Sequence, residues 1–136
     1  MSEILNTSGE FYSAVFGEKL TGTYTHAHIM GASMGGGMVL KAGYTYVDII
    51  DSIIAVAPAW VENDVDNLKK IRKPVLMVWG SDDTVVPPSL GKKYLEAIKG
   101  SRLEIVAGSK HPVYIEKAEE FFKIVSDFLT GKSTGK

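Results

Sequence analysis

The stretch Gly31-Ala32-Ser33-Met34-Gly35 constrains this chain more than any other feature of its sequence. It follows a strand-like segment at 23–30 and precedes a segment of helical length at 34–44, so the chain is expected to turn sharply at Ser33. A serine in such a turn adopts a strained backbone conformation, and glycine at positions 31 and 35 removes side chains that would collide. The pattern G-x-S-x-G in this context predicts a turn that lifts the Ser33 hydroxyl clear of the sheet.

Strand-like and helix-like segments alternate along the rest of the chain. Nearly continuous runs of apolar residues at 52–57 and 75–79 are typical of strands covered on both faces by helices. The spacing at 118–129 predicts an amphipathic helix. Further expected elements are helices at 7–16 and 87–98 and a strand at 103–106. This order predicts the α/β class, with a parallel sheet of about four strands flanked by helices.

Length and composition indicate one domain and exclude several classes of partner. The chain has 136 residues, of which 45% are hydrophobic, so we expect a single domain over residues 1–130 and a disordered tail at 131–136. Fifteen basic residues against 16 acidic ones argue against nucleic acid or a charged membrane surface as a partner. Without cysteine, and with no apolar run long enough to span a bilayer, the chain is expected to be cytoplasmic.

A reactive serine needs a base and an acid, and the sequence offers both. His111 lies in a loop after a predicted strand, and Pro112 keeps it out of helical geometry. Asp82 and Asp83 directly follow another strand, and either could orient the imidazole. The backbone amide of Met34, at the start of the helix, could stabilise an oxyanion. No metal or cofactor is expected.

Three segments together resemble the α/β-hydrolase superfamily, over roughly residues 23–130. Gly31 to Gly36 resembles its G-x-S-M-G-G elbow, Gly80 to Pro87 its G-x-x-D-x-x-V-P acid loop, and Gly108 to His111 its G-x-x-H loop. The chain order Ser, Asp, His is also that of the superfamily. The resemblance implies that Asp83, three residues after the glycine, is the acid, and that Asp82 is a solvated turn residue. The sequence further resembles small, lidless, esterase-like members of this superfamily.

The sequence also departs from this family. Members have several strands before the elbow and a second oxyanion donor from a loop there, and this sequence shows neither. We therefore expect a truncated fold in which the edge of strand 23–30 is open, and a two-fold homodimer through this edge is one hypothesis. A fragment of a longer gene product is the other.

Four further residues have two readings each. Pro58 and Trp60 follow a strand end and could line an acyl pocket, although Trp60 could equally cover the core. His26 and His28 share a strand face, but packing is favoured over a metal pair because no third ligand is apparent.

Three functions compete. The leading hypothesis is a serine hydrolase that cleaves small carboxylic esters or other acyl groups through an acyl-serine intermediate. A non-catalytic fragment or scaffold that retains the three residues comes next. A nucleotide- or phosphate-binding module comes last, because Gly31-x-Ser33 breaks the G-x-G start and Gly131-Lys132-Ser133 lacks the upstream glycine of a P-loop.

Overall fold

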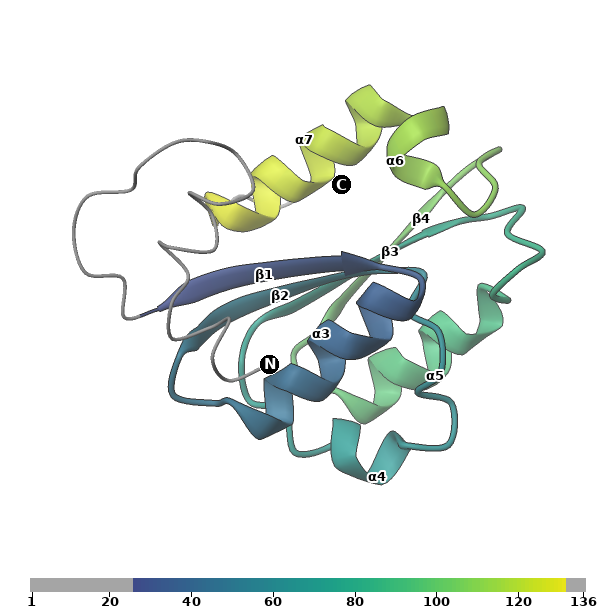
Figure 1. Ribbon diagram of the computed structural model, residues 1–136. Helices are drawn as coiled ribbons and strands as arrows, with labels where there is room; N and C mark the ends of the chain where they lie inside the picture. The colour runs from purple at the N-terminus through teal and green to yellow at the C-terminus, as the bar shows by residue number, and fades with distance from the viewer. Residues whose placement is uncertain (1–25, 132–136) are drawn as a thin grey trace, which may run out of the picture.

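Four parallel strands form the centre of the molecule. In this computed structural model, which describes residues 26–131, they lie in the order β1-β2-β3-β4, and each neighbouring pair is parallel. Helices cover both faces of the sheet, which gives three layers (Figure 1). The elements in chain order are β1 (Ala27–Ala32), α3 (Met34–Thr45), β2 (Ile50–Val56), α4 (Val65–Leu68), β3 (Val75–Gly80), α5 (Ser89–Ala97), β4 (Arg102–Val106), α6 (Val113–Glu116) and α7 (Ala118–Leu129). The predicted α/β class and four-stranded parallel sheet are confirmed.

The predicted elements within residues 26–131 are all present, with ends that differ by a few residues. For example, β1 runs to Ala32 rather than ending at residue 30, and β2 begins at Ile50 rather than at residue 52. The sequence did not predict the short helices α4 and α6. The helix expected at 7–16 and all of the predicted tail except Gly131 lie outside the described residues.

The two central strands separate two apolar cores. Side chains of β2 and β3 alternate between the faces, so Ile53 and Met77 belong to one core while Ile54 and Leu76 belong to the other. The first core is closed by α3, α4 and α5, and the second by α6 and α7, on opposite sides of the sheet (Figure 1). Every residue of β3 is buried, as the continuous apolar run predicted.

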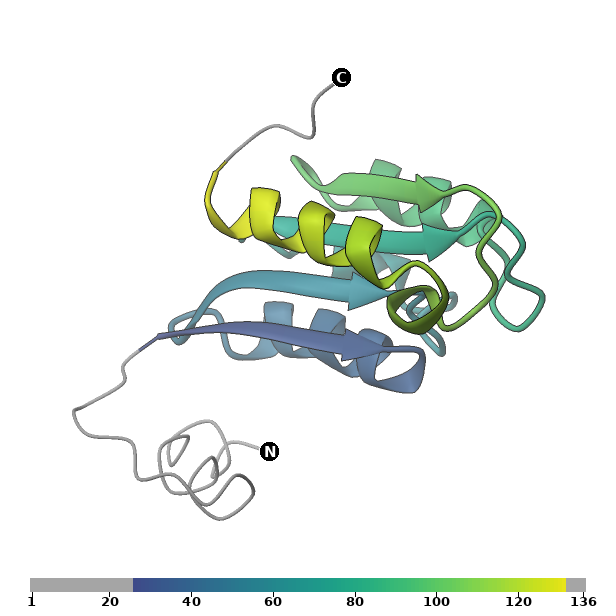
Figure 2. The same cartoon turned by 90° about the horizontal axis from the view of Figure 1, so that it is seen from above.

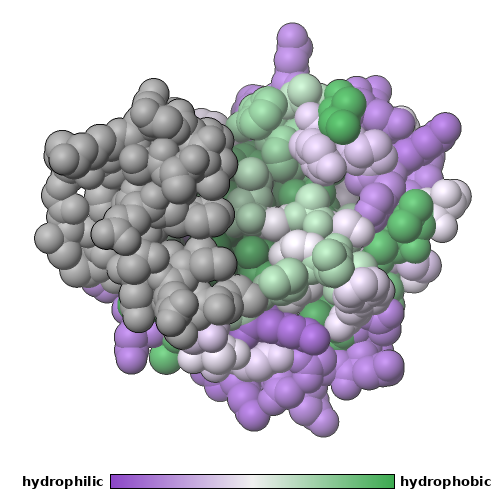
Figure 3. Space-filling model, viewed as in Figure 1, coloured by the Kyte–Doolittle hydropathy of each residue, from purple (hydrophilic) through white to green (hydrophobic). Residues whose placement is uncertain are grey.

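The two outer strands are less protected. Figure 2 shows β1 and β4 at opposite sides of the sheet, and β1 pairs with β2 alone among the described strands. Met30, Met34 and Met38, on β1 and α3, are each about half exposed, with exposed fractions of 56%, 49% and 44%. Figure 3 looks toward this side of the molecule and shows apolar and pale surface between hydrophilic margins. Within residues 26–131, no helix is both long and apolar enough to cross a bilayer.

Candidate active site

Parallel strands bring the predicted site residues to one edge of the sheet. Ser33 follows β1, Asp83 follows β3 and His111 follows β4, so all three lie beyond carboxyl ends of strands (Figure 1). Ligands of open α/β sheets bind outside this edge. The loop after β2, which contains Pro58 and Trp60, begins at the same edge of the sheet.

Ser33 occupies a strained turn between β1 and α3. Its backbone angles are φ 56° and ψ −118°, and φ in the left-handed region is uncommon for a residue other than glycine. Two hydrogen bonds hold this conformation: the Ser33 amide donates to Val56 O at 2.8 Å, and the Ala59 amide donates to Ser33 O at 2.9 Å. The end of β2 and the loop after it therefore fix the serine, which sequence reasoning attributed to the turn alone.

The glycines of the turn do not contribute equally. A Cβ built on Gly31 would lie 2.2 Å from the carbonyl oxygen of Gly35, whereas a Cβ on Gly35 would meet nothing within 4 Å. A Cβ on Gly36 would lie 3.0 Å from both Pro58 Cα and Val56 O. The expectation that both Gly31 and Gly35 avoid a collision of their own side chains is thus wrong for Gly35. The tight positions are Gly31, Gly37, whose Cβ would lie 2.0 Å from Ala59 O, and, to a lesser degree, Gly36.

Asp83 is the anchor of the acid loop. Its side chain is fully buried, and Oδ1 accepts hydrogen bonds from the amides of Val85 at 2.8 Å and Val86 at 2.9 Å. The other oxygen, Oδ2, lies 2.7 Å from His111 Nδ1. An ionised carboxylate can only accept hydrogen bonds, so the proton on His111 Nδ1 points toward Asp83. The other ring nitrogen, Nε2, then remains available to accept a proton.

Asp82 differs from Asp83 in every respect that matters for this pairing. Asp82 is exposed, and among the described residues its carboxylate accepts only from the neighbouring Ser81 hydroxyl, at 2.7 Å. The structure thus pairs His111 with Asp83 and leaves Asp82 as a solvated turn residue. A residue that the sequence did not single out braces the loop: the buried indole of Trp79 donates to Val86 O at 2.9 Å. A buried Trp N–H generally has an acceptor, which is the signal that could have found it.

The loop that carries His111 is clamped from two sides. The Lys110 amide donates to Glu116 Oε2 at 2.7 Å, and the Gly108 amide donates to Ser81 Oγ at 2.9 Å. A Cβ on Gly80 would lie 2.2 Å from Ser109 O, so the end of β3 packs directly against this loop. The imidazole itself is 22% exposed.

Ser33 and Met34 line a small cavity beside the acid loop. Its volume is about 320 Å³. The residues that line it are Ser33, Met34, Ala59, Trp60, Glu62, Val85, Val86, Pro87 and Leu90. Trp60 is 69% exposed, so it does not cover the core, and its φ of 64° is another strained angle at this edge. Pro58, by contrast, is buried and is not among the lining residues.

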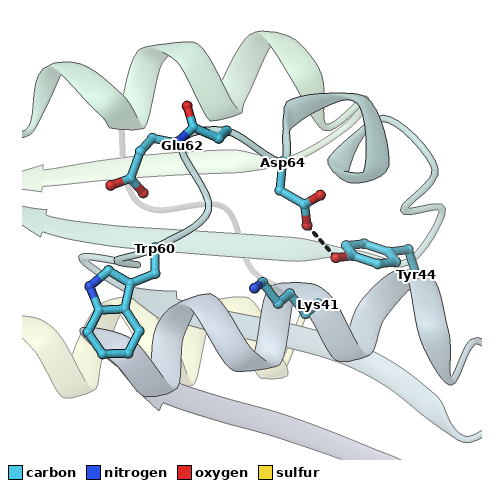
Figure 4. A pocket seen from close by; sticks show the side chains of 6 residues that line it. Lys41, Tyr44, Trp60, Glu62 and Asp64 are labelled. Atoms are coloured by element: carbon cyan, nitrogen blue, oxygen red, sulfur yellow. Dashed lines mark hydrogen bonds between the residues drawn. The ribbon is translucent and has the colours of Figure 1, made fainter.

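A larger hollow of about 580 Å³ adjoins this cavity and shares Trp60 and Glu62 with it. Figure 4 shows side chains that line it, among them Tyr44, whose hydroxyl donates a hydrogen bond to Asp64. Burial, followed by the hydrogen bond to Asp64 and the charge of Asp64, raises the pKa of Tyr44 to about 12. Hydrogen bonds from Tyr44 and then Asn67 hold the pKa of Asp64 below its usual value.

Not every predicted contact is made. Among residues 26–131, no hydrogen bond joins the Ser33 hydroxyl to His111, although such bonds are often long or poorly aligned before substrate binds. His28, considered as half of a metal pair, instead has Nδ1 at 2.7 Å from Ser52 Oγ.

The arrangement of four parallel strands flanked by helices is that of the α/β hydrolases. Residues 54–135 match the family model of TAP-like proteins, and the chain belongs to this family of α/β hydrolases. A crystal structure of a predicted CIB-like hydrolase from Thermoplasma acidophilum is 55% identical, with a TM-score of 0.77 over 92% of this chain and 59% of that one. A structure with bound ferulic acid, Est1E from Butyrivibrio proteoclasticus, shares the fold at 23% identity, with a TM-score of 0.70 over 90% of this chain and 66% of that one.

Two curated relatives are hydrolases by name. A pimeloyl-[acyl-carrier protein] methyl ester esterase of Neisseria meningitidis is 38% identical over 64 residues, 47% of this chain and 25% of that protein. Mouse serine hydrolase BPHL is 37% identical over 62 residues, 46% of this chain and 21% of that protein. The matched parts are therefore a quarter or less of the length of these relatives.

Proposed function

We propose that this chain carries the catalytic residues of a serine hydrolase, with Ser33 as nucleophile, His111 as general base and Asp83 as the residue that orients His111. One observation carries this proposal: a strained serine lies at the same sheet edge as a histidine whose Nδ1 is 2.7 Å from a fully buried carboxylate. Membership in the α/β-hydrolase family supports it.

The chemistry follows from the roles of these groups. His111 Nε2 takes the proton of Ser33 Oγ as the oxygen attacks the carbonyl carbon of the substrate. When the tetrahedral intermediate collapses, the same proton passes to the leaving alkoxide and an acyl-serine remains. Water, deprotonated by His111, then attacks the acyl carbon, and Ser33 leaves with the proton to complete the cycle.

Met34 supplies one donor for the oxyanion. It is the first residue of α3, so its amide has no carbonyl partner within the helix, and the positive end of the helix dipole lies at the same place. We propose that this N–H binds the developing negative charge. A second donor is not apparent among the described residues, and loss of one donor typically costs on the order of a hundred- to a thousandfold in turnover.

The proposed substrates are small carboxylic esters or other acyl compounds. The cavity beside Ser33 is small and lined largely by apolar side chains, which suits a short acyl group. The names of the relatives, a methyl ester esterase and a serine hydrolase, support ester cleavage. Pro58 lies behind the cavity and would act only by supporting Gly36, whereas Trp60 can contact substrate directly.

The test compares the wild type with Ser33→Ala on a short-chain p-nitrophenyl ester and locates any fluorophosphonate adduct by mass spectrometry. We expect turnover and a Ser33 adduct in the wild type and neither in the variant. Equal inertness of both proteins would reject the proposal. It would instead favour a non-catalytic scaffold. The observation in favour of that alternative is that no hydrogen bond joins Ser33 to His111 within the described residues.

We also propose that β1 pairs with β1 of a second copy. Its outer edge is open among the described strands, and exposed strand edges readily pair with other chains. Sedimentation velocity should show a dimer that dissociates when Met30, 56% exposed on β1, is replaced by Lys. A monomer at all concentrations would exclude this pairing.

A further inference from the structure

Glu62 carries the one carboxylate among the described residues that line the Ser33 cavity. The other eight lining residues are apolar, apart from Ser33 itself and the indole of Trp60. A carboxylate in such a place controls which charges the cavity accepts, because electrostatic interactions strengthen as water is excluded. Sequence reasoning did not single out Glu62, since nothing in the 60–73 stretch predicted which side chain faces Ser33.

The carboxylate of Glu62 lacks partners. Its Oε2 is buried without a hydrogen bond, and no ion pair joins it to a Lys or Arg among residues 26–131. The hydroxyl of Tyr94, on a residue that is completely buried, is also without a hydrogen bond. Burial, and after it the negative charge of Glu62, raises the pKa of Tyr94 to about 12. Buried polar groups in native proteins usually find a partner, so the carboxylate of Glu62 retains unfilled acceptor capacity.

The backbone around Glu62 is fixed even though its carboxylate is not. Lys93 Nζ donates to the carbonyl oxygen of Glu62 at 2.9 Å, and the strained Trp60 precedes it by two residues. Figure 4 shows the Glu62 carboxylate on the Trp60 side, turned away from the paired Asp64 and Tyr44. The carboxylate is thus presented to the cavity by a held loop.

We propose that Glu62 is a specificity-determining residue, and that the substrate part held beside Ser33 carries a cationic or hydrogen-bond-donating group. Such a group would pair with the carboxylate of Glu62, which lines the cavity, whereas an acyl chain that ends in a carboxylate would be repelled. This inference rests on the proposed function of Ser33 and names the substrate class of that site: small acyl compounds with an amino or similar donor group, not monoesters of dicarboxylic acids.

The first arm of the test measures turnover on two p-nitrophenyl esters of equal chain length, the valerate and the anionic monoglutarate. We expect wild-type kcat/KM to favour the valerate by roughly tenfold or more, and Glu62→Gln to remove most of that preference. Glu119→Gln, which removes the same charge from an exposed position on α7, should leave the ratio unchanged.

The second arm needs no catalysis. Calorimetric titration with 5-aminovalerate, valerate and glutarate should give affinities in that order for Ser33→Ala, and the order should collapse in Ser33→Ala with Glu62→Gln. If Glu62→Gln lowers the melting temperature strongly, Glu62→Met, which keeps the side-chain volume, takes its place.

The outcomes separate the two proposals. Absence of turnover in the wild type rejects the serine hydrolase, while the binding order still decides the role of Glu62. Turnover with an ester preference that is the same in wild type and Glu62→Gln overturns the inference. A change in stability alone, with unchanged ratio and binding order, would show that Glu62 and Tyr94 only pack together.

Discussion

Two carboxylates in this molecule, Asp83 and Asp64, each form a hydrogen bond with an aromatic side chain, His111 and Tyr44 respectively. The two pairs differ in whether the aromatic ring has a second polar atom that can transfer a proton. Asp83 is fully buried, receives two backbone amides on one oxygen and holds His111 on the other. Asp64, which is part-buried and lines the larger hollow, accepts hydrogen bonds from the Tyr44 hydroxyl and the side-chain amide of Asn67. In the Asp83–His111 pair, the second ring nitrogen of His111 remains available for a further proton transfer. In the Asp64–Tyr44 pair, the tyrosine has no second polar atom that could take part in one.

The difference shows why the hydrogen bond alone does not identify a site. A histidine has a second nitrogen that can accept a proton once the first is held by a carboxylate, and a tyrosine has one polar atom. The backbone amides around Asp83 also fix its carboxylate in a way that the side chain of Asn67 cannot. We therefore expect substitutions at Asp83 to affect catalysis and those at Asp64 and Tyr44 to affect stability.

The largest expected effect is that of Asp83→Asn. The amide side chain can still accept from Val85 and Val86, but its NH₂ group would face His111 and favour the wrong tautomer of the imidazole. We expect kcat to fall on the order of a thousand- to ten-thousandfold, measured on a p-nitrophenyl ester. Asp82→Asn is the matched control. A similar loss in both variants would contradict the assignment of Asp83 as the orienting acid.

The next largest effect concerns the strain at Ser33. Gly31→Ala forces a Cβ to within 2.2 Å of Gly35 O, a backbone atom that cannot move freely, so we expect the free energy of unfolding to fall by about 3 kcal/mol. Gly35→Ala places its Cβ in open space within a helix and should be neutral or stabilising by up to about 1 kcal/mol. Urea denaturation of both variants decides it, and equal losses would refute the steric account.

A smaller effect is expected where the His111 loop is clamped. Glu116→Ala removes the acceptor for the Lys110 amide, so the position of the neighbouring His111 becomes less well defined. We expect kcat to fall about tenfold with little change in KM, because a displacement of a catalytic group acts on the transition state.

Glu116→Gln should restore most of the activity, since its side-chain carbonyl can accept the same hydrogen bond. Failure of Glu116→Gln to rescue, or a loss confined to KM, would show that Glu116 does not act by positioning His111.

The sequence predicted the parts of this edge that depend on local pattern. Apolar runs predicted the buried strands β2 and β3, and the glycine-rich turn predicted the change from strand to helix at Ser33. The resemblance to a family selected Asp83 over Asp82, and the structure pairs Asp83 with His111. These features depend on residues that are close together in the chain or on strand order, and both can be read without coordinates.

The features that the sequence could not predict depend on contacts between distant segments. Glu62 and Ser33 are 29 positions apart, and only the packing of the loop after β2 against α3 brings them to one cavity. Such contacts come from tertiary packing, for which periodicity and spacing give no signal.

The smallest expected effect is that of Tyr44→Phe, which removes the hydrogen bond to Asp64 without changing the ring. We expect a loss of about 1 kcal/mol in the free energy of unfolding and unchanged ester turnover.

The pH dependence of this stability difference has a definite sign. Because folding lowers the pKa of Asp64, its contribution is present above its unfolded pKa and is lost as pH falls through the folded value. Because folding raises the pKa of Tyr44 to about 12, its contribution is complete below pH 10, its ordinary pKa, and is lost as pH rises toward 12. The stability difference between wild type and Tyr44→Phe should therefore be greatest near neutral pH and shrink in both directions. Thermal unfolding across pH measures it, and a difference that grows in acid, or a loss of turnover in Tyr44→Phe, would mean that this pair belongs to the active site after all.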